Sequence, residues 1–180
     1  YFITTFSSAT QPPVYTLNDA KAGKQLQMIE ENQTLSNNLK GFNLPTKEFS
    51  VLKTEKGIEL NMWMMKPKDF DANKKYPVFM FQYSGPGSQQ VNNDWNSGDD
   101  YWFASLTQKG YIVVCVDGRG TGFKGAAFKK VTQKELGKYE VIDQIDAAKV
   151  LGSYSFVDKS RIGIFGWSFG GFMASNCILK

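Results

Sequence analysis

The chain has 180 residues, of which 42% are hydrophobic and 21% charged, and its formal net charge is +4. This balance is typical of a globular protein, and the lysines are scattered without a basic, aromatic-rich stripe, so no nucleic-acid partner is predicted. There is no histidine, and Cys115 and Cys177 lie far apart in apolar segments. We therefore expect neither a metal site nor a cofactor.

The N-terminal segment, residues 1–46, is rich in Thr, Ser, Gln, Asn and Pro and shows no helical periodicity. Short strand-like pieces occur at residues 1–5 and 14–17. We interpret the segment as β-structure that belongs to a neighbouring domain, followed by a linker. Over residues 48–65, apolar side chains alternate after a turn at residues 55–57, which predicts an antiparallel hairpin.

From residue 77 onward, predicted strands and helices alternate, which favours an α/β fold with a mostly parallel sheet and crossover helices. We expect Asp99 or Asp100 to cap the first of these helices and Gly110 to end it. The predicted elements are a strand at 78–82, a helix ending at 110, a strand at 111–116, an amphipathic helix at 140–151, a buried parallel strand at 161–165 and a buried helix at 169–179.

The peptide Gly-Trp-Ser-Phe-Gly-Gly at residues 166–171 falls between the last predicted strand and helix. A serine at such a turn is the nucleophile elbow of α/β-hydrolases. The turn strains the serine backbone, and side chains at 166 and 170 would collide with the neighbouring strand and helix, so glycine is required there. We predict Ser168 as a nucleophile. The alternative is a glycine-lined turn in which Ser168 only caps a helix.

The loop at residues 83–87 leaves the end of the predicted strand at 78–82, where α/β-hydrolases place a loop that helps to build the oxyanion hole. One oxyanion donor would be the backbone N–H of Phe169, the residue after the serine. Pro86 has no N–H, whereas the phenol of Tyr83 can donate. Tyr83 could equally be a core residue with its hydroxyl at the rim.

A second glycine pattern, Gly-x-Gly-x-x-Gly at residues 120–125, follows a strand as in dinucleotide-binding proteins. A Rossmann unit also needs a helix that opens on those glycines and a second strand that ends in an acidic residue about 20 residues further on. Here that distance falls inside the helix predicted at 140–151. We interpret the glycines as a loop at a strand end.

Acidic residues gather on or near the helix predicted at 140–151, namely Glu135, Glu140, Asp143 and Asp146. We expect them to form its solvated face or to pair with lysines such as Lys138 and Lys149. Glycosidase chemistry by a carboxylate pair is not supported.

Four segments together resemble the prolyl oligopeptidase family in order and spacing, and within that family mostly the dipeptidyl peptidase IV branch of bacteria. They are residues 83–89, 117–122, 136–144 and 166–171. Members join a β-propeller to an α/β-hydrolase domain and cleave peptides after proline, less often after alanine, near the N-terminus. The resemblance implies that residues 1–46 are the last propeller strands and the hinge, and that residues 47–180 are the first part of the catalytic domain.

Carried over by position, the resemblance implies that Ser168 is the nucleophile and Tyr83 the oxyanion-hole phenol. Phe169 would give a backbone N–H and line the pocket for the proline ring. The substrates would be peptides with proline or alanine at the second position. Family members suggest a periplasmic, secreted or surface-anchored location.

The resemblance also places the triad acid and histidine after the serine in chain order. The resemblance implies that the intact parent is a serine exopeptidase. Because this chain has no histidine, we expect no activity from the 180 residues alone. We also expect the strand at 161–165 to present an unpaired apolar edge, which favours a homo-oligomer or another associated segment. The alternatives are a non-catalytic binding module of the same fold, or the tripeptidyl or acylaminoacyl branch. A lipase or esterase would need a different oxyanion loop.

Overall fold

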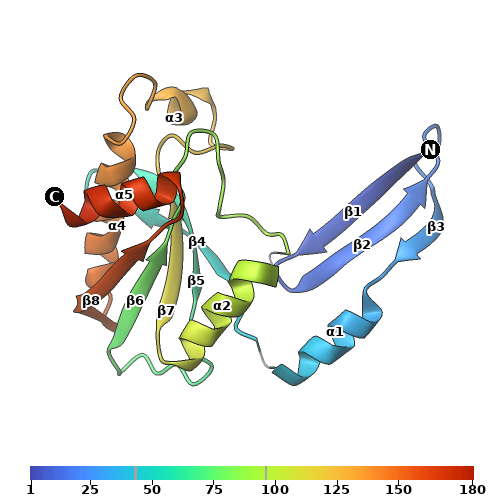
Figure 1. Cartoon of the computed structure of the whole chain (residues 1–180), viewed down its shortest axis with the longest axis horizontal. Helices are drawn as coiled ribbons and strands as arrows, with labels where there is room; N and C mark the ends of the chain where they lie inside the picture. The colour runs from blue at the N-terminus through green and yellow to red at the C-terminus, as the bar shows by residue number, and fades with distance from the viewer. Residues whose placement is uncertain (43, 96) are drawn as a thin grey trace.

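The computed structural model describes residues 1–42, 44–95 and 97–180, which form a three-stranded sheet and a separate five-stranded sheet with helices packed on it. The three-stranded sheet extends away from the α/β part, and the two termini lie at opposite ends of the molecule (Figure 1). Within the described residues, no helix is both long and apolar enough to cross a membrane.

The N-terminal sheet is an antiparallel meander in the order β1-β2-β3. The strands predicted at 1–5 and 14–17 are confirmed, whereas β3 and α1 were not predicted. α1 has the sequence QTLSNNL, buries no residue and has no side-chain cap, so neither helix propensity nor an apolar face marks it. The elements are β1 (Phe2–Ser8), β2 (Gln11–Asn18), β3 (Gln25–Glu30), α1 (Gln33–Leu39) and a 3-10 turn (Lys40–Phe42).

The predicted hairpin over residues 48–65 is confirmed as β4 (Glu48–Lys53) and β5 (Glu59–Met65), paired antiparallel. Alternation along β5 sends Leu60, Met62 and Met64 to one core and Trp63 and Met65 to another. β5 is therefore covered on both faces, which fits the unbroken apolar run over its last four residues, 62–65.

The five-stranded sheet has the order β4-β5-β7-β6-β8. The strands β7, β6 and β8 are parallel neighbours, and β5 runs antiparallel to both of its neighbours. The sheet is thus mixed, and the expected parallel arrangement holds for its C-terminal strands. The elements from residue 76 are β6 (Tyr76–Phe81), α2 (Ser97–Gln108), β7 (Ile112–Asp117), α3 (Ala126–Lys130), α4 (Tyr139–Gly152), β8 (Val157–Phe165) and α5 (Phe169–Ile178).

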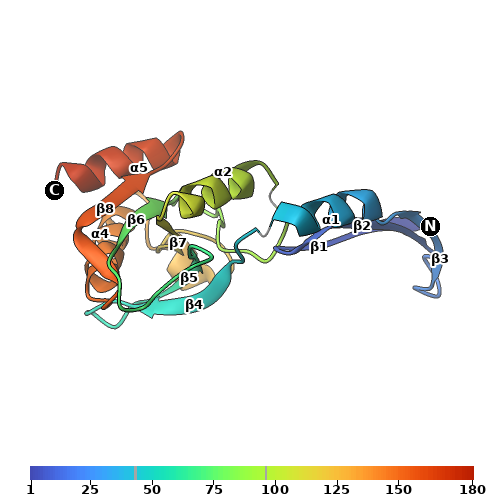
Figure 2. The ribbon, with the colours of Figure 1, turned by 90° about the horizontal axis from the view of Figure 1, so that it is seen from below.

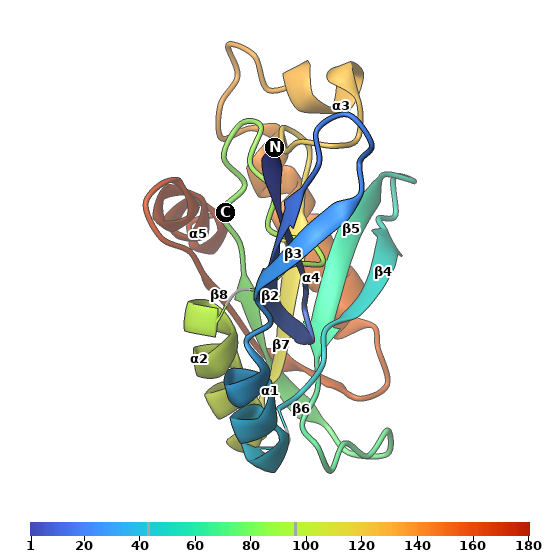
Figure 3. The same cartoon turned by 90° about the vertical axis from the view of Figure 1, so that its right-hand side faces the viewer.

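Two apolar cores lie on opposite faces of this sheet. One includes Ala147 and Leu151 of α4, and the other includes Phe103 of α2. Figure 2 shows α2 and α4 on the two sides of the sheet. α5 packs against α4 and β8, and Figure 3 shows β1, β2 and β3 in front of the five-stranded sheet. β7 lies between β5 and β6, and every residue of it is buried. The sheet therefore holds the end of β6 and the start of α5 in fixed positions.

Three sequence expectations need correction. Asp99 and Asp100 lie in the first turn of α2, which begins at Ser97, so neither is its N-cap residue. α5 is less buried than expected, since only Gly170, Met173 and Ala174 are buried. β8 likewise alternates between half-buried and exposed residues over most of its length, because within the described residues it pairs only with β6 and forms an edge of the sheet.

Candidate active site

Ser168 lies at the turn between the last residue of β8 and the first residue of α5. Its backbone has φ 54° and ψ −116°, a conformation that is unfavourable for a residue with a Cβ atom. Its side chain is exposed. The structure thus places the serine at an exposed, strained strand-to-helix turn, as the sequence predicted.

The flanking glycines have the expected steric role. A Cβ atom at Gly166 would lie 2.4 Å from the backbone carbonyl of Gly170, and a Cβ atom at Gly170 would lie 2.5 Å from the carbonyl oxygen of Gln82. Real Cβ contacts are not this short, so a side chain at either position would push α5 away from β8 or from the end of β6.

The structure brings Tyr83 and Phe169 together beside this turn. Tyr83 lies two residues after the end of β6, and its ring centroid lies 6.2 Å from that of Phe169, with the planes tilted by 47°. Both residues are half-buried. A Cβ atom at Gly85 would lie 2.3 Å from Cε1 of Tyr83, so a side chain at residue 85 would displace the phenol ring from this position.

The glycine-rich loop at residues 120–125 braces the loop that carries Tyr83. The N–H of Gly87 donates to the carbonyl of Gly120 at 2.8 Å, and the N–H of Gly122 donates to the carbonyl of Ser88 at 2.8 Å. α3, which follows Gly125, is only five residues long, and the region about 20 residues after Gly120 lies in α4. This arrangement lacks the helix and second strand of a Rossmann unit.

Asp117, at the end of β7, is a buried residue that the sequence reasoning did not single out. Its carboxylate accepts hydrogen bonds from the backbone N–H groups of Gln90 and Val91, at 3.0 and 2.8 Å. Burial raises the pKa of this carboxyl, although the two N–H donors oppose the shift. Its place directly after an apolar strand is the signal that could have identified it.

Glu140 and Asp143 do not belong to a solvated face, which corrects the expectation for this helix. Both are fully buried. Asp143 forms an ion pair with Arg119, whose Nη2 lies 2.6 Å and whose Nε lies 3.0 Å from Oδ1 of the aspartate. Glu140 accepts a hydrogen bond from the N–H of Gly137 at 3.0 Å, and burial raises the pKa of its carboxyl.

The two remaining acidic residues of the group form the expected pairs. Lys138 contacts Glu135 at 2.6 Å, and Lys149 contacts Asp146 at 3.7 Å. Within the part of the chain that the structure describes, no cluster of His, Cys, Asp and Glu could hold a metal ion. Cys115 and Cys177 are both free.

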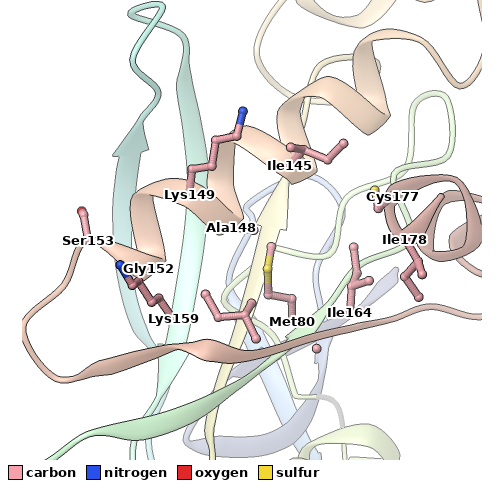
Figure 4. A pocket seen from close by; sticks show the side chains of 12 residues that line it. Met80, Ile145, Ala148, Lys149, Gly152, Ser153, Lys159, Ile164, Cys177 and Ile178 are labelled. Carbon is pink, nitrogen blue, oxygen red and sulfur yellow. The ribbon is translucent and has the colours of Figure 1, made fainter. Parts of the chain in front are cut away.

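A groove of about 670 Å³ lies away from Ser168, between α4 and α5 and along the outer side of β8. Figure 4 shows Ile145 of α4, Ile164 of β8 and Ile178 of α5 around it, with Met80 of β6 at its base. Ser168, Tyr83 and Phe169 are not among its lining residues. The groove therefore belongs to the open edge of the sheet and not to the serine turn.

The described residues define an α/β protein with a mixed sheet. Ser168 lies in a strained turn between β8 and α5, beside the loop at residues 83–87 that carries Tyr83, here called the tyrosine loop. The sequence model of the prolyl oligopeptidase family matches residues 97–180. This part of the chain is therefore similar to that family of peptidases.

Individual relatives agree with the family match. Probable dipeptidyl-aminopeptidase B of Podospora anserina is 47% identical over 153 residues, which are 85% of this chain and 16% of the relative. Dipeptidyl peptidase 4 of Trichophyton equinum is 38% identical over 181 residues, which are 99% of this chain and 23% of the relative. The chain thus spans less than a quarter of the length of these curated relatives.

Solved structures give the same result. The crystal structure of Porphyromonas gingivalis dipeptidyl peptidase 4 is 45% identical and superposes with a TM-score of 0.93, over 97% of this chain and 24% of that chain. A putative dipeptidyl aminopeptidase IV from Bacteroides ovatus is 36% identical, with a TM-score of 0.85, over 98% of this chain and 25% of that chain. The likeness includes the N-terminal sheet, because it covers nearly the whole chain.

Proposed function

We propose that the complete protein that contains this chain is a serine exopeptidase of the dipeptidyl peptidase IV type, which removes N-terminal dipeptides after proline or alanine. The strained backbone of Ser168 between β8 and α5, with Tyr83 packed beside Phe169, is the observation that carries the proposal. The names of the relatives, dipeptidyl-aminopeptidase B and dipeptidyl peptidase 4, support it.

Ser168 is assigned the attack on the carbonyl carbon of the second residue of the peptide. The charge that develops on the carbonyl oxygen would accept hydrogen bonds from the Phe169 N–H and the Tyr83 phenol. The Phe169 N–H suits this role because the first turn of a helix has no intrahelical acceptors for its N–H groups. The ring of Phe169, held against Tyr83, would line the pocket for the proline ring.

The covalent steps follow from this assignment. The serine proton passes to a base, the C–O bond to Ser168 forms, and the scissile C–N bond breaks as the leaving amine takes that proton. Water then hydrolyses the ester on Ser168 and releases the dipeptide. The base and its acid partner are assigned to residues of the complete protein outside these 180, since this chain contains no histidine.

We assign residues 1–46 to the last strands of a β-propeller and its hinge, and residues 47–180 to the first part of the catalytic domain. β1 to β3 form an antiparallel meander, the strand arrangement of propeller blades. Phe2, Ile3, Phe6 and Leu26 are exposed on this small sheet, so it has apolar surface for neighbouring blades to cover.

Hydrolysis of substrates of different N-terminal length tests the peptidase assignment. We expect the complete protein to release 4-nitroaniline from glycyl-prolyl-4-nitroanilide and not from its N-acetylated form. Preference for a tripeptide or an acylated amino acid would instead assign the protein to the tripeptidyl or acylaminoacyl branch.

The 180 residues alone are expected to be inactive, because a serine hydroxyl without a base is a poor nucleophile at neutral pH. The same assay on the purified chain, with Ser168→Ala as control, tests this. Amine release by the chain that disappears in the control would contradict it.

A non-catalytic binding module of the same fold is the second candidate, and the lack of histidine in this chain favours it. The two candidates differ in the sequence of the complete protein. An aspartate followed by a histidine after residue 180 supports the peptidase, whereas their absence supports the binding module.

The open edge of β8 is proposed as an association surface, either for another copy or for a further segment of the complete protein. β8 pairs only with β6 within the described residues, and the groove beside it is lined by apolar residues such as Ile162 and Ile178. Exposed edges of this kind pair readily with other strands. We expect light scattering of the 180-residue chain to show self-association, and a monodisperse monomer would contradict this.

A further inference from the structure

Ser84, the residue after Tyr83, has a backbone conformation that needs support from its surroundings. Its φ is 60°, in the left-handed region, although it is not a glycine. It is only 1% exposed. A residue held in this region persists where neighbouring contacts fix it, so the position of the tyrosine loop depends on what holds Ser84.

Side-chain hydrogen bonds connect Ser84 to the serine turn. The Ser84 hydroxyl donates to Oε1 of Gln82 at 2.9 Å. Nε2 of the same Gln82 donates to the carbonyl of Gly170 at 2.7 Å. Gly170 is the second residue of α5, so Gln82 links Ser84, which follows Tyr83, to Gly170, which follows Phe169.

Gln144 of α4 connects Ser84 to the sheet on the other side. Its Nε2 donates to the Ser84 hydroxyl at 3.2 Å and to the carbonyl of Val116 at 2.8 Å. Val116 belongs to β7, in the centre of the sheet. Gln82, Ser84 and Gln144 are each at most 1% exposed, so water does not compete for these hydrogen bonds.

We propose that Gln82, Ser84 and Gln144 form a positioning relay that fixes the Tyr83 phenol relative to Ser168 and Phe169. The inference rests on the proposed role of Tyr83 as an oxyanion donor. The relay residues act through Tyr83 and do not contact the reacting atoms. Since oxyanion stabilisation depends on donors placed before the reaction begins, loss of the relay should lower kcat more than it changes KM.

A double-mutant cycle in the complete peptidase tests the inference. We expect Ser84→Ala to lower kcat for glycyl-prolyl-4-nitroanilide by about 10- to 100-fold, the size of effect that follows when a catalytic group is misplaced. In the Tyr83→Phe background, Ser84→Ala should lower kcat no further, because the group it positions is gone. Ser160→Ala is the control, since it removes an exposed hydroxyl at the far end of β8 and should leave kcat unchanged.

The outcomes separate the relay from the proposed function. If Tyr83→Phe alone leaves kcat unchanged, the oxyanion role of Tyr83 fails and the relay loses its purpose. If Tyr83→Phe lowers kcat but the effect of Ser84→Ala multiplies with it, the relay is refuted and the oxyanion role stands. Ser84→Gly adopts the same φ without strain, so it keeps the test valid should Ser84→Ala fold poorly, and we expect it to lower kcat as well.

Hydrogen exchange of the 180-residue chain gives a readout that does not require activity. The N–H groups of Gly87 and Ser88 are hydrogen-bonded within and beside the tyrosine loop. In Ser84→Ala we expect them to exchange about tenfold faster while the N–H of Val114 in the sheet centre changes little. Equal acceleration at all three positions would show a general loss of stability and would contradict the relay.

Discussion

Gly170 lies so close to Gln82 that a Cβ atom on Gly170 would stand 2.5 Å from the carbonyl oxygen of Gln82. This approach brings the first turn of α5 against the end of β6, and with it Phe169 against Tyr83. The close packing of a helix against a strand end thus sets the geometry of the candidate active site.

Replacing Gly170 by alanine should destabilise the chain, because the extra methyl group meets backbone and not a movable side chain. We expect Gly170→Ala to lower the free energy of unfolding by about 1 to 3 kcal/mol, as overpacking does. Gly163→Ala is a matched control on β8, where a Cβ atom would meet nothing within 4 Å. Urea unfolding of both variants measures the difference, and equal stabilities would contradict the steric account.

The ion pair of Arg119 and Asp143 should matter far more than the surface pairs. Asp143 is buried, so Arg119→Met leaves a carboxylate without its cation, and we expect a loss of about 2 to 4 kcal/mol in unfolding free energy. Lys138→Met breaks the exposed pair with Glu135 and should lower the unfolding free energy far less, because water screens this pair. Urea unfolding would contradict this if the two losses were equal.

The two cysteines should differ in their reaction with a thiol reagent. Cys115 is fully buried in β7, and burial raises the pKa of its thiol well above the ordinary value. Cys177 is half-buried, and burial raises its pKa as well. We expect a disulfide reagent to modify Cys177 slowly and Cys115 only after unfolding. Mass spectrometry of the partly modified chain would contradict this if Cys115 reacted first.

The contribution of Asp117 to the free energy of unfolding should fall as the pH rises. Burial raises the pKa of its carboxyl in the folded state, so the folded chain binds a proton that the unfolded chain has lost above a pH of about 4. The contribution is therefore full below the unfolded pKa and is lost as the pH rises through the folded pKa.

Urea unfolding at several pH values between 4 and 7 measures this contribution. The stability of the original chain relative to Asp117→Asn should be greatest at pH 4. Asp158 provides a control, because hydrogen bonds from Ser160 and Arg161 lower its pKa to about 2. Its contribution is lost only as the pH falls below about 4, so the difference for Asp158→Asn should stay constant between pH 4 and 7. A difference for Asp117→Asn that is independent of pH would contradict the assignment.

Much of the fold was predictable because local patterns and tertiary packing agree. The alternation that predicted the hairpin places Leu60, Met62 and Met64 in one core, and the helical periodicity predicted a helix where α4 lies. The positions of Gly166 and Gly170 followed from the sterics of a strand-to-helix turn. The place of Ser168 at this turn was predictable for the same reason.

What could not be predicted depends on partners distant in sequence. Asp143 is buried because Arg119, 24 positions earlier, reaches it, and helix periodicity alone assigns an aspartate to the solvent. Gln82 and Gln144 look like ordinary polar residues until the fold brings Ser84 and Gly170 to them. α1 carries no pattern because it buries no side chain.

Covalent capture of the nucleophile tests the central claim most directly. A dipeptidyl phosphonate diphenyl ester with proline at its second position phosphonylates an activated serine, and peptide mapping by mass spectrometry locates the adduct. We expect the complete protein to carry one adduct on Ser168, and Ser168→Ala to carry none and to lose hydrolysis of glycyl-prolyl-4-nitroanilide. An adduct on another residue, or full activity of Ser168→Ala, would contradict the account.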